Sequence, residues 1–97
     1  MEKITTTIKR EWLREIVAQR KTVEYRDIKP YWERRFKRIK PPFVLRLING
    51  MSRNAREVTV EVRNVRRNKR KGQFELYLGT IIEVRNWDIK RERPRNA

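Results

Sequence analysis

The chain reads Gln19-Arg20-Lys21-Thr22-Val23-Glu24-Tyr25-Arg26 at the point where a predicted helix gives way to a predicted strand. The residues before this stretch carry apolar side chains at the spacing of one helix face, which predicts a helix over residues 8–18. Thr7 is a candidate N-cap for that helix. The apolar stripe consists of Ile8, Trp12, Leu13, Ile16 and Val17.

The second half of the stretch alternates polar residues with β-branched and aromatic ones, a pattern typical of a strand. Residues two apart in a strand share a face, so we expect Val23 and Tyr25 to pack inward. Glu24 and Arg26 are then expected side by side at the surface or mouth of a barrel. Lys21 precedes the strand, and its side chain is expected to lie over the same position as Glu24 and Arg26.

The remaining elements are predicted from the same two periodicities. A helix is expected at residues 30–39, and strands at 3–7, 43–48, 58–63 and 74–84. Gly79 lies inside the last strand, where a glycine indicates a bulge or a barrel corner. The predicted fold is α+β: a small, mostly antiparallel β-barrel of about five to six strands with two short helices in the N-terminal half.

A chain of 97 residues has room for one domain with one modest core. We assign residues 1–87 to this domain. Residues 88–97 contain Pro94 and show no apolar periodicity after Ile89, so they are expected to form a basic, mobile tail.

The charge of the chain points toward a polyanionic partner. Lys and Arg number 27 against 12 acidic residues, which gives a net charge of +15. Self-repulsion at this charge opposes compaction, so a partner that neutralises the charge, nucleic acid above all, is expected.

The chain contains no cysteine and no histidine. Their absence from the sequence removes disulfides, thiolate nucleophiles and the commonest transition-metal ligands, so neither a metal nor a cofactor is expected. No run of residues is long and apolar enough for a membrane span, and residues 1–4 lack the start of a signal peptide. We therefore expect an intracellular, cytoplasmic protein without a membrane partner.

The cations gather in two clusters that contain no acidic residue, at residues 34–40 and 66–71. Any one of these side chains is readily explained as a solvated surface group. Together, on a helix and on a hairpin loop, they predict a discrete phosphate-binding surface. The candidate phosphate ligands are Arg35, Lys37, Arg38, Lys40, Arg66, Arg67, Lys69, Arg70 and Lys71.

The aromatic residues divide into two groups. Six lie at core-facing periodicities and are expected to pack in the interior: Trp12, Tyr25, Trp32, Phe36, Phe43 and Phe74. Tyr31, Tyr77 and Trp87 lie on polar sides or just past the last strand, so they are the candidates for stacking on bases.

The spacing K-x-x-E-x-R of Lys21, Glu24 and Arg26 resembles the signature of the ASCH domains, small β-barrels related to the PUA RNA-binding fold. Those domains carry G-x-K-x-x-E-x-R, and this chain has Gln19 at the glycine position. The resemblance extends through residues 8–18, the Lys29-Pro30-Tyr31-Trp32 segment and residues 78–84, which is nearly the whole chain. It implies that Lys21, Glu24 and Arg26 line a ligand cleft.

Two classes of function are open. In the first, the chain is an RNA-binding module: the clusters hold phosphates of single-stranded or structured RNA, and the motif cleft takes an unpaired nucleotide. In the second, it is a small metal-independent enzyme, a ribonuclease or an amidohydrolase of a modified nucleoside, with Lys21 and Glu24 as catalytic residues. The amidohydrolase-like branch of the family has Thr at the position of Glu24, which argues against that chemistry. A DNA-binding or virus-encoded accessory role is a weaker third idea, and no helix-turn-helix or zinc pattern supports it.

Overall fold

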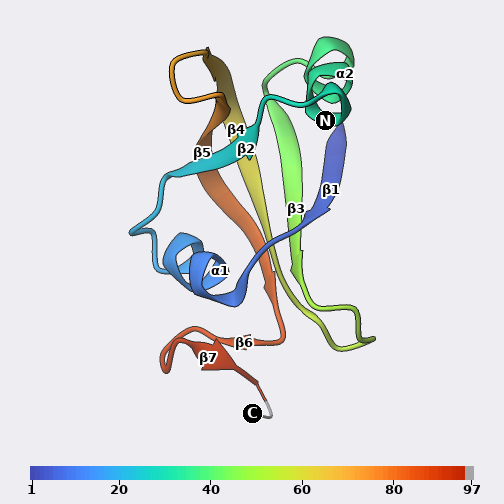
Figure 1. The fold of residues 1–97 in the computed structure, drawn as a ribbon. Coiled ribbons are helices and arrows are strands. Elements are labelled where there is room, and N and C mark those ends of the chain that lie inside the picture. The colour runs from blue at the N-terminus through green and yellow to red at the C-terminus, as the bar shows by residue number, and fades with distance from the viewer. Residues whose placement is uncertain (96–97) are drawn as a thin grey trace.

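The protein is described here by a computed structural model, which covers residues 1–95. Its elements are β1 (Lys3–Thr7), α1 (Arg10–Val17), β2 (Val23–Asp27), α2 (Pro30–Arg38), β3 (Phe43–Asn49), β4 (Arg56–Asn68), β5 (Gln73–Arg85), β6 (Trp87–Asp88) and β7 (Arg93–Pro94) (Figure 1). Five strands form one mixed sheet in the order β1-β3-β4-β5-β2. The sheet curls into a half-barrel, so the expected α+β class and the mostly antiparallel pairing are confirmed.

The sheet has β1 and β2 as its two edges and therefore does not close on itself. β1 runs parallel to β3, and the other three pairings are antiparallel. The register of β4 against β5 shifts between the Val60–Ile81 and Val62–Leu78 pairs, because β5 carries one extra residue there. This bulge lies at Gly79, as the sequence predicts, and it helps to bend the two long strands.

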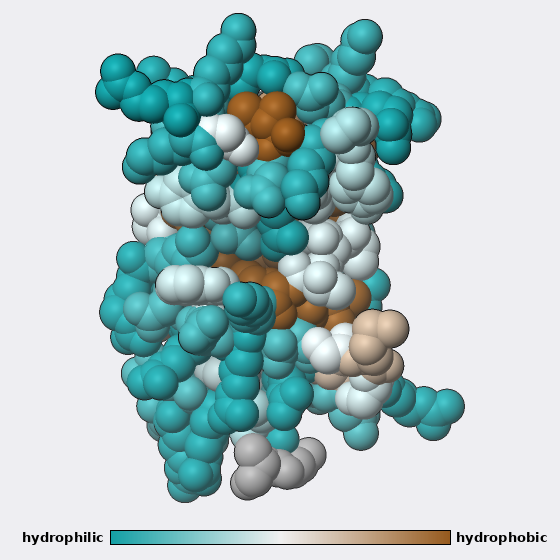
Figure 2. Space-filling model, in the orientation of Figure 1, coloured by the Kyte–Doolittle hydropathy of each residue, from teal (hydrophilic) through white to brown (hydrophobic). Residues whose placement is uncertain are grey.

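The concave side of the sheet holds the core. β3 and β4 bury alternate apolar side chains, including Leu45, Leu47, Val58, Val60 and Val62, and Thr59 of β4 is buried as well. Both helices contribute apolar side chains to this core, Leu13, Ile16 and Val17 from α1 and Trp32 and Phe36 from α2. Figure 2 shows that the outside of the molecule is hydrophilic over most of one face, with hydrophobic atoms visible in a patch near the top and in a band across the middle.

Two aromatic residues expected in the core are exposed. Trp12 is 47% exposed and Tyr25 is 44% exposed. Trp12 precedes Leu13 by one position, so it lies about 100° around the helix from the buried stripe. The start of α1 also differs from the expectation, because Thr7 ends β1 and Lys9 takes the N-cap position without a side-chain cap.

The orientation of β2 is the reverse of the one expected. Glu24 pairs with Leu76 and Arg26 with Phe74 across to β5, and directly opposed residues share a face of the sheet. Leu76 and Phe74 are both buried, so Glu24 and Arg26 point to the core side and Tyr25 points outward. The expectation that Glu24 and Arg26 lie side by side is confirmed.

The end of the chain differs from the expected mobile tail as far as residue 95. β6 and β7 pair in a two-stranded sheet, and Trp87 and Pro94 are buried. Glu92 forms ion pairs with Arg14 and Arg20, so the hairpin is tied to α1 and the turn that follows it. The last two residues of the expected tail, 96 and 97, lie outside the described residues.

None of the helices in residues 1–95 is long and apolar enough to cross a membrane.

Candidate nucleic-acid interface

The turn after α1 sets the position of the motif. Gln19 adopts φ 61°, the left-handed conformation that glycine favours. Its N–H donates to the Ile16 carbonyl at 2.9 Å, and the Arg20 N–H donates to the Glu15 carbonyl at 2.9 Å. This is the Schellman arrangement that ends helices, in which the left-handed position is usually a glycine. Gln19 therefore occupies, with a side chain, a position whose backbone conformation glycine adopts without strain.

Glu24 is the centre of a buried ion-pair network. It is only 5% exposed, and both carboxylate oxygens are engaged. Oε1 accepts a hydrogen bond from the Tyr25 N–H at 3.1 Å and lies 3.4 Å from Lys21 Nζ. Oε2 accepts a hydrogen bond from Arg26 at 2.8 Å. Two cations on one carboxylate leave the trio with one net positive charge.

Arg26 joins the two edges of the half-barrel. From β2 it donates to the Thr7 carbonyl of β1 at 2.9 Å and to the Thr6 hydroxyl at 3.4 Å. Its guanidinium also lies over the Trp32 ring, 5.4 Å from the centroid. The Arg26 Nε is buried and has no partner among the described residues. Arg26 is therefore a structural brace of the barrel as well as a member of the motif.

Lys21 lies between two exposed aromatic rings. Its Nζ is 5.2 Å from the centroid of Trp12 and 4.8 Å from that of Tyr25. The ammonium thus combines two cation–π contacts with the Glu24 ion pair.

A groove of about 790 Å³ opens beside this cluster. All three motif side chains line it, as the family resemblance implies. Its other lining residues are Thr7, Ile8, Lys9, Trp12, Tyr25 and Asn49. We call it the motif groove.

The motif groove combines what an unpaired nucleotide needs. Trp12 and Tyr25 offer partly exposed aromatic rings for a base, and the exposed Lys9 offers a cation for a phosphate, whereas Lys21 is already paired with Glu24. Sequence reasoning missed both aromatic residues because it placed them in the core. The available signal was the position of Trp12 at the border of the helix stripe, whereas the alternation of Tyr25 with Glu24 and Arg26 does not show which side of the strand faces the core.

The two basic clusters remain largely free of acidic partners. Among residues 1–95, nine of their ten cations have no carboxylate within 4.0 Å, and the exception is Arg67, which lies 2.8 Å from Glu33. The nine are Arg34, Arg35, Lys37, Arg38, Lys40, Arg66, Lys69, Arg70 and Lys71.

The fold brings the two clusters to one end of the molecule, where α2 faces the hairpin between β4 and β5 (Figure 1). A groove of about 530 Å³ separates them, with Lys37 and Lys40 from the first cluster and Arg67 from the second among its lining residues. We call this region the basic end and define it by residues 34–40 and 66–71.

One acidic residue, Glu75, lies opposite Arg66 on the hairpin. Hydrogen bonds from Asn68 and from Tyr77 hold the pKa of its carboxyl below the ordinary value. The Tyr77 hydroxyl donates to it at 2.8 Å, so this stacking candidate is tied into the hairpin.

The other two residues predicted to stack on bases differ in their exposure. Trp87 is buried and is not accessible to a base, whereas Tyr31 is 44% exposed on α2.

The described part of the chain contains no group of three or more Asp or Glu side chains placed to hold a metal ion. No family model matches the sequence, and neither the curated proteins nor the solved structures that were compared with it include a match.

Proposed function

We propose that the protein is an RNA-binding domain of the ASCH type that works inside the cell. The basic end attracts and holds phosphates, and the motif groove receives an unpaired nucleotide of single-stranded or structured RNA. The observation that carries the proposal is the basic end itself: nine cations without a carboxylate partner within residues 1–95, on two elements that the fold brings together.

Charge of this kind favours nucleic acid over a small anion. Each contact between a Lys or Arg and a phosphate releases counterions from the polymer, and the gain grows with the number of contacts. A surface of about five to seven such contacts gives useful affinity without base readout. Within residues 1–95, Glu33 is the one acidic residue that forms an ion pair with this surface, through Arg67.

The motif groove supports the choice of RNA with an unpaired nucleotide. Trp12 and Tyr25 present ring faces, and a base inside a duplex cannot stack on them. Glu24 is buried and both of its oxygens accept from the protein, so it holds Lys21 and Arg26 in place at the groove.

Photocrosslinking tests this proposal. A single-stranded RNA that contains 4-thiouridine is bound to the purified protein, irradiated and digested, and the modified peptides are identified by mass spectrometry. Crosslinks are expected in the peptides that carry Trp12 and Tyr25. Labelled RNA should also protect Lys37, Lys40 and Arg66 from chemical modification.

The matched control is the same RNA annealed to its complement, which should protect the lysines but crosslink poorly to Trp12 and Tyr25. The absence of any crosslink or protection above an unirradiated or RNA-free control would contradict the proposal.

The second candidate function, metal-independent catalysis, is favoured by one contact. The Lys21 ammonium lies 3.4 Å from Glu24 Oε1 in the wall of the groove, which is the arrangement of a possible acid–base pair. Catalysis predicts that Lys21→Ala and Glu24→Gln each abolish turnover of a labelled RNA or acylated nucleoside while RNA affinity is kept. We favour binding, because both Glu24 oxygens already accept from protein donors. Turnover in the presence of a chelator that disappears in both variants would reverse this preference.

A further inference from the structure

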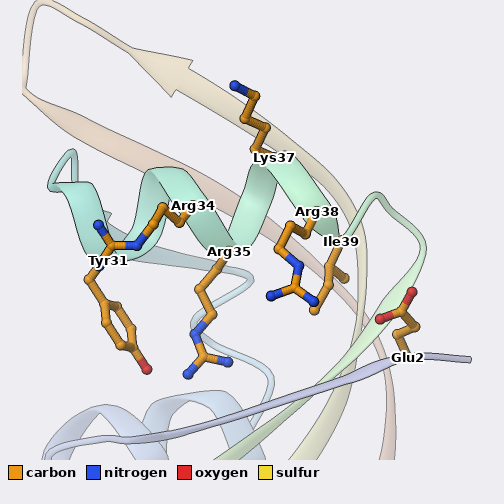
Figure 3. Close-up of a pocket in the computed structure, with 7 residues that line it drawn as sticks. All are labelled: Glu2, Tyr31, Arg34, Arg35, Lys37, Arg38 and Ile39. Atoms are coloured by element: carbon orange, nitrogen blue, oxygen red, sulfur yellow. The ribbon is translucent and has the colours of Figure 1, made fainter.

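α2 carries a pocket that the motif groove does not include. It has a volume of about 680 Å³ and lies beside α2, on the side of the helix where Glu2 is found (Figure 3). Its lining residues are Glu2, Tyr31, Arg34, Arg35, Lys37, Arg38 and Ile39. We call it the α2 pocket. Its volume lies within the range of about 300–1,000 Å³ that is usual for small-ligand sites.

An aromatic ring and two guanidinium groups share one face of α2 in this pocket. Tyr31, Arg35 and Arg38 are spaced i, i+4 and i+7, which places them in one row along the helix. Figure 3 shows the side chains of Tyr31 and Arg35 descending from the helix on the same side, while Lys37 points away. The Arg35 guanidinium lies 4.8 Å from the centroid of the Tyr31 ring.

The Tyr31 ring is fixed and yet accessible. The edge-on contact with Trp32, at a centroid distance of 5.0 Å and an interplanar angle of 82°, orients it. It still keeps 44% of its surface exposed. A planar aromatic–guanidinium pair of this kind stacks on a nucleobase, and the neighbouring cations are available for its phosphates.

The pocket also contains the carboxylate of Glu2. The backbone carbonyl of Glu2 accepts a hydrogen bond from the Val44 N–H at 2.8 Å, which holds this residue beside α2 although it precedes β1. No ion pair within the described residues joins Glu2 to the arginines of the pocket. Its carboxylate can therefore accept from the amino group of a base that enters.

β1 connects the α2 pocket with the motif groove. Glu2 lines the former, and Thr7, the last residue of β1 and five positions further along the chain, lines the latter. At roughly 3.3 Å per residue this strand spans about 16 Å. One nucleic-acid strand of a few nucleotides can bridge that distance along an edge of the sheet.

We propose that the α2 pocket is a second nucleotide subsite, in which an unpaired base stacks on Tyr31 and Arg35, and that one continuous RNA strand occupies it together with the motif groove. This inference rests on the proposed function. It specifies the ligand as one single-stranded RNA that lies along β1. It assigns to Arg35 and Arg38 a base-proximal role, distinct from the general attraction exerted by the hairpin cluster.

The test is a length series of single-stranded oligoadenylates, from about three to twelve nucleotides, measured by fluorescence anisotropy at one salt concentration. The wild-type protein should gain affinity steeply at the length that spans both sites. Tyr31→Ala should weaken the long oligonucleotides by about 5- to 150-fold, the loss of one stacked base, and leave the shortest ones nearly unchanged.

Two control variants separate stacking from charge and from folding. Tyr31→Phe keeps the ring and should bind as the wild type does. Arg35→Lys keeps the charge but loses the planar group, so it should recover only part of the affinity that Arg35→Ala loses. Circular dichroism melts should agree for all four variants, because both side chains lie at the surface.

The failures of the two proposals can be distinguished. If the wild type binds RNA but affinity is independent of length beyond the shortest oligonucleotide, or Tyr31→Ala binds every length as the wild type does, the second subsite is contradicted and the proposed function stands. If a duplex of the same length competes as well as the single strand does, stacking in the pocket is contradicted. If the wild type binds no oligonucleotide of any length, both proposals are contradicted.

Discussion

The motif groove and the basic end both contain cations, but these cations differ in burial and in their pairing with carboxylates. At the groove, Lys21 and Arg26 are about five-sixths buried, and both contact the carboxylate of Glu24. At the basic end, only Arg67 has a carboxylate partner within the described residues. Paired, buried charges fix the positions of groups, whereas unpaired, exposed ones create a field that reaches a partner at a distance. We therefore expect the groove to determine which nucleotide is held and the basic end to determine how strongly the polymer is attracted.

The largest effect is expected on the free energy of unfolding, when the buried ion pairs of the motif groove are removed. Glu24→Ala leaves two cations facing each other with little access to water, and it should lower the free energy of unfolding by about 2–4 kcal/mol. The loss lies at the lower end for buried pairs because Lys21 and Arg26 keep part of their side chains in water. Chemical denaturation measures it.

The matched control for this variant is Arg70→Ala at the basic end. It should change the free energy of unfolding by no more than about 0.5 kcal/mol, because the side chain is exposed and unpaired. Equal losses in the free energy of unfolding of the two variants would contradict the expected difference between the buried cations of the groove and the exposed cations of the basic end.

The next largest effect is expected on RNA affinity, when an aromatic ring is removed from the motif groove. Trp12→Ala removes a ring face from the motif groove, so single-stranded RNA should bind more weakly by about 1–3 kcal/mol. Trp12→Phe should restore most of that affinity. Trp12 is exposed, so thermal melts should change little. A loss of affinity for single strand and duplex alike would mean that Trp12 does not stack on a base.

Periodicity predicted most of the fold, because helix and strand patterns depend on neighbours along the chain. It placed both helices, β5 and the bulge at Gly79 within two residues, but it ended β4 at residue 63, five residues before its observed end at Asn68. It failed where the outcome depends on distant partners. The inward direction of Glu24 follows from its pairing with Leu76, more than 50 residues later, and from neutralisation by Lys21 and Arg26.

The same limit applies to the aromatic residues and the end of the chain. Trp87 follows a strand and precedes a polar segment, and nothing local shows that it is buried. The hairpin of β6 and β7 is held by Glu92, whose partners Arg14 and Arg20 lie more than 70 residues away. The composition of the basic clusters, in contrast, was sufficient to locate each cluster along the chain, whereas their meeting at one end of the molecule depends on the fold.

A smaller effect concerns the turn that positions the motif. Gln19→Gly relieves a left-handed backbone conformation, and this gain exceeds the added freedom of the unfolded chain. The free energy of unfolding should rise by about 0.5–1 kcal/mol, and RNA affinity should be kept or improved. Gln19→Ala serves as the control and should not stabilise. A loss of stability in Gln19→Gly would show that the Gln19 side chain contributes contacts that the glycine cannot replace.

The smallest effect is a response of the C-terminal hairpin to acid. Hydrogen bonds from Arg20 lower the pKa of both Glu15 and Glu92 from the ordinary value of 4.5. Carboxyls with a lowered pKa contribute stability that is complete above that ordinary value and is lost as the pH falls through the lowered one. The protection of the amides of residues 87–95 against exchange, corrected for the intrinsic rate at each pH, should therefore fall below about pH 4.5, whereas the protection of the amides of α2 should not change. Glu92→Gln should weaken this acid response, and an identical response in that variant would contradict the assignment.

The central claim, that the two regions divide attraction from recognition, is tested most directly by the salt dependence of RNA binding. The logarithm of the binding constant should fall against the logarithm of salt concentration with a slope of about −4 to −5 for the wild type, from roughly 0.7 per phosphate contact. Replacement of Arg66, Arg67 and Arg70 by Ala should flatten the slope by about 2, whereas Trp12→Ala should lower the affinity and leave the slope unchanged. An unchanged slope in the triple variant, or an equal flattening in Trp12→Ala, would contradict the account.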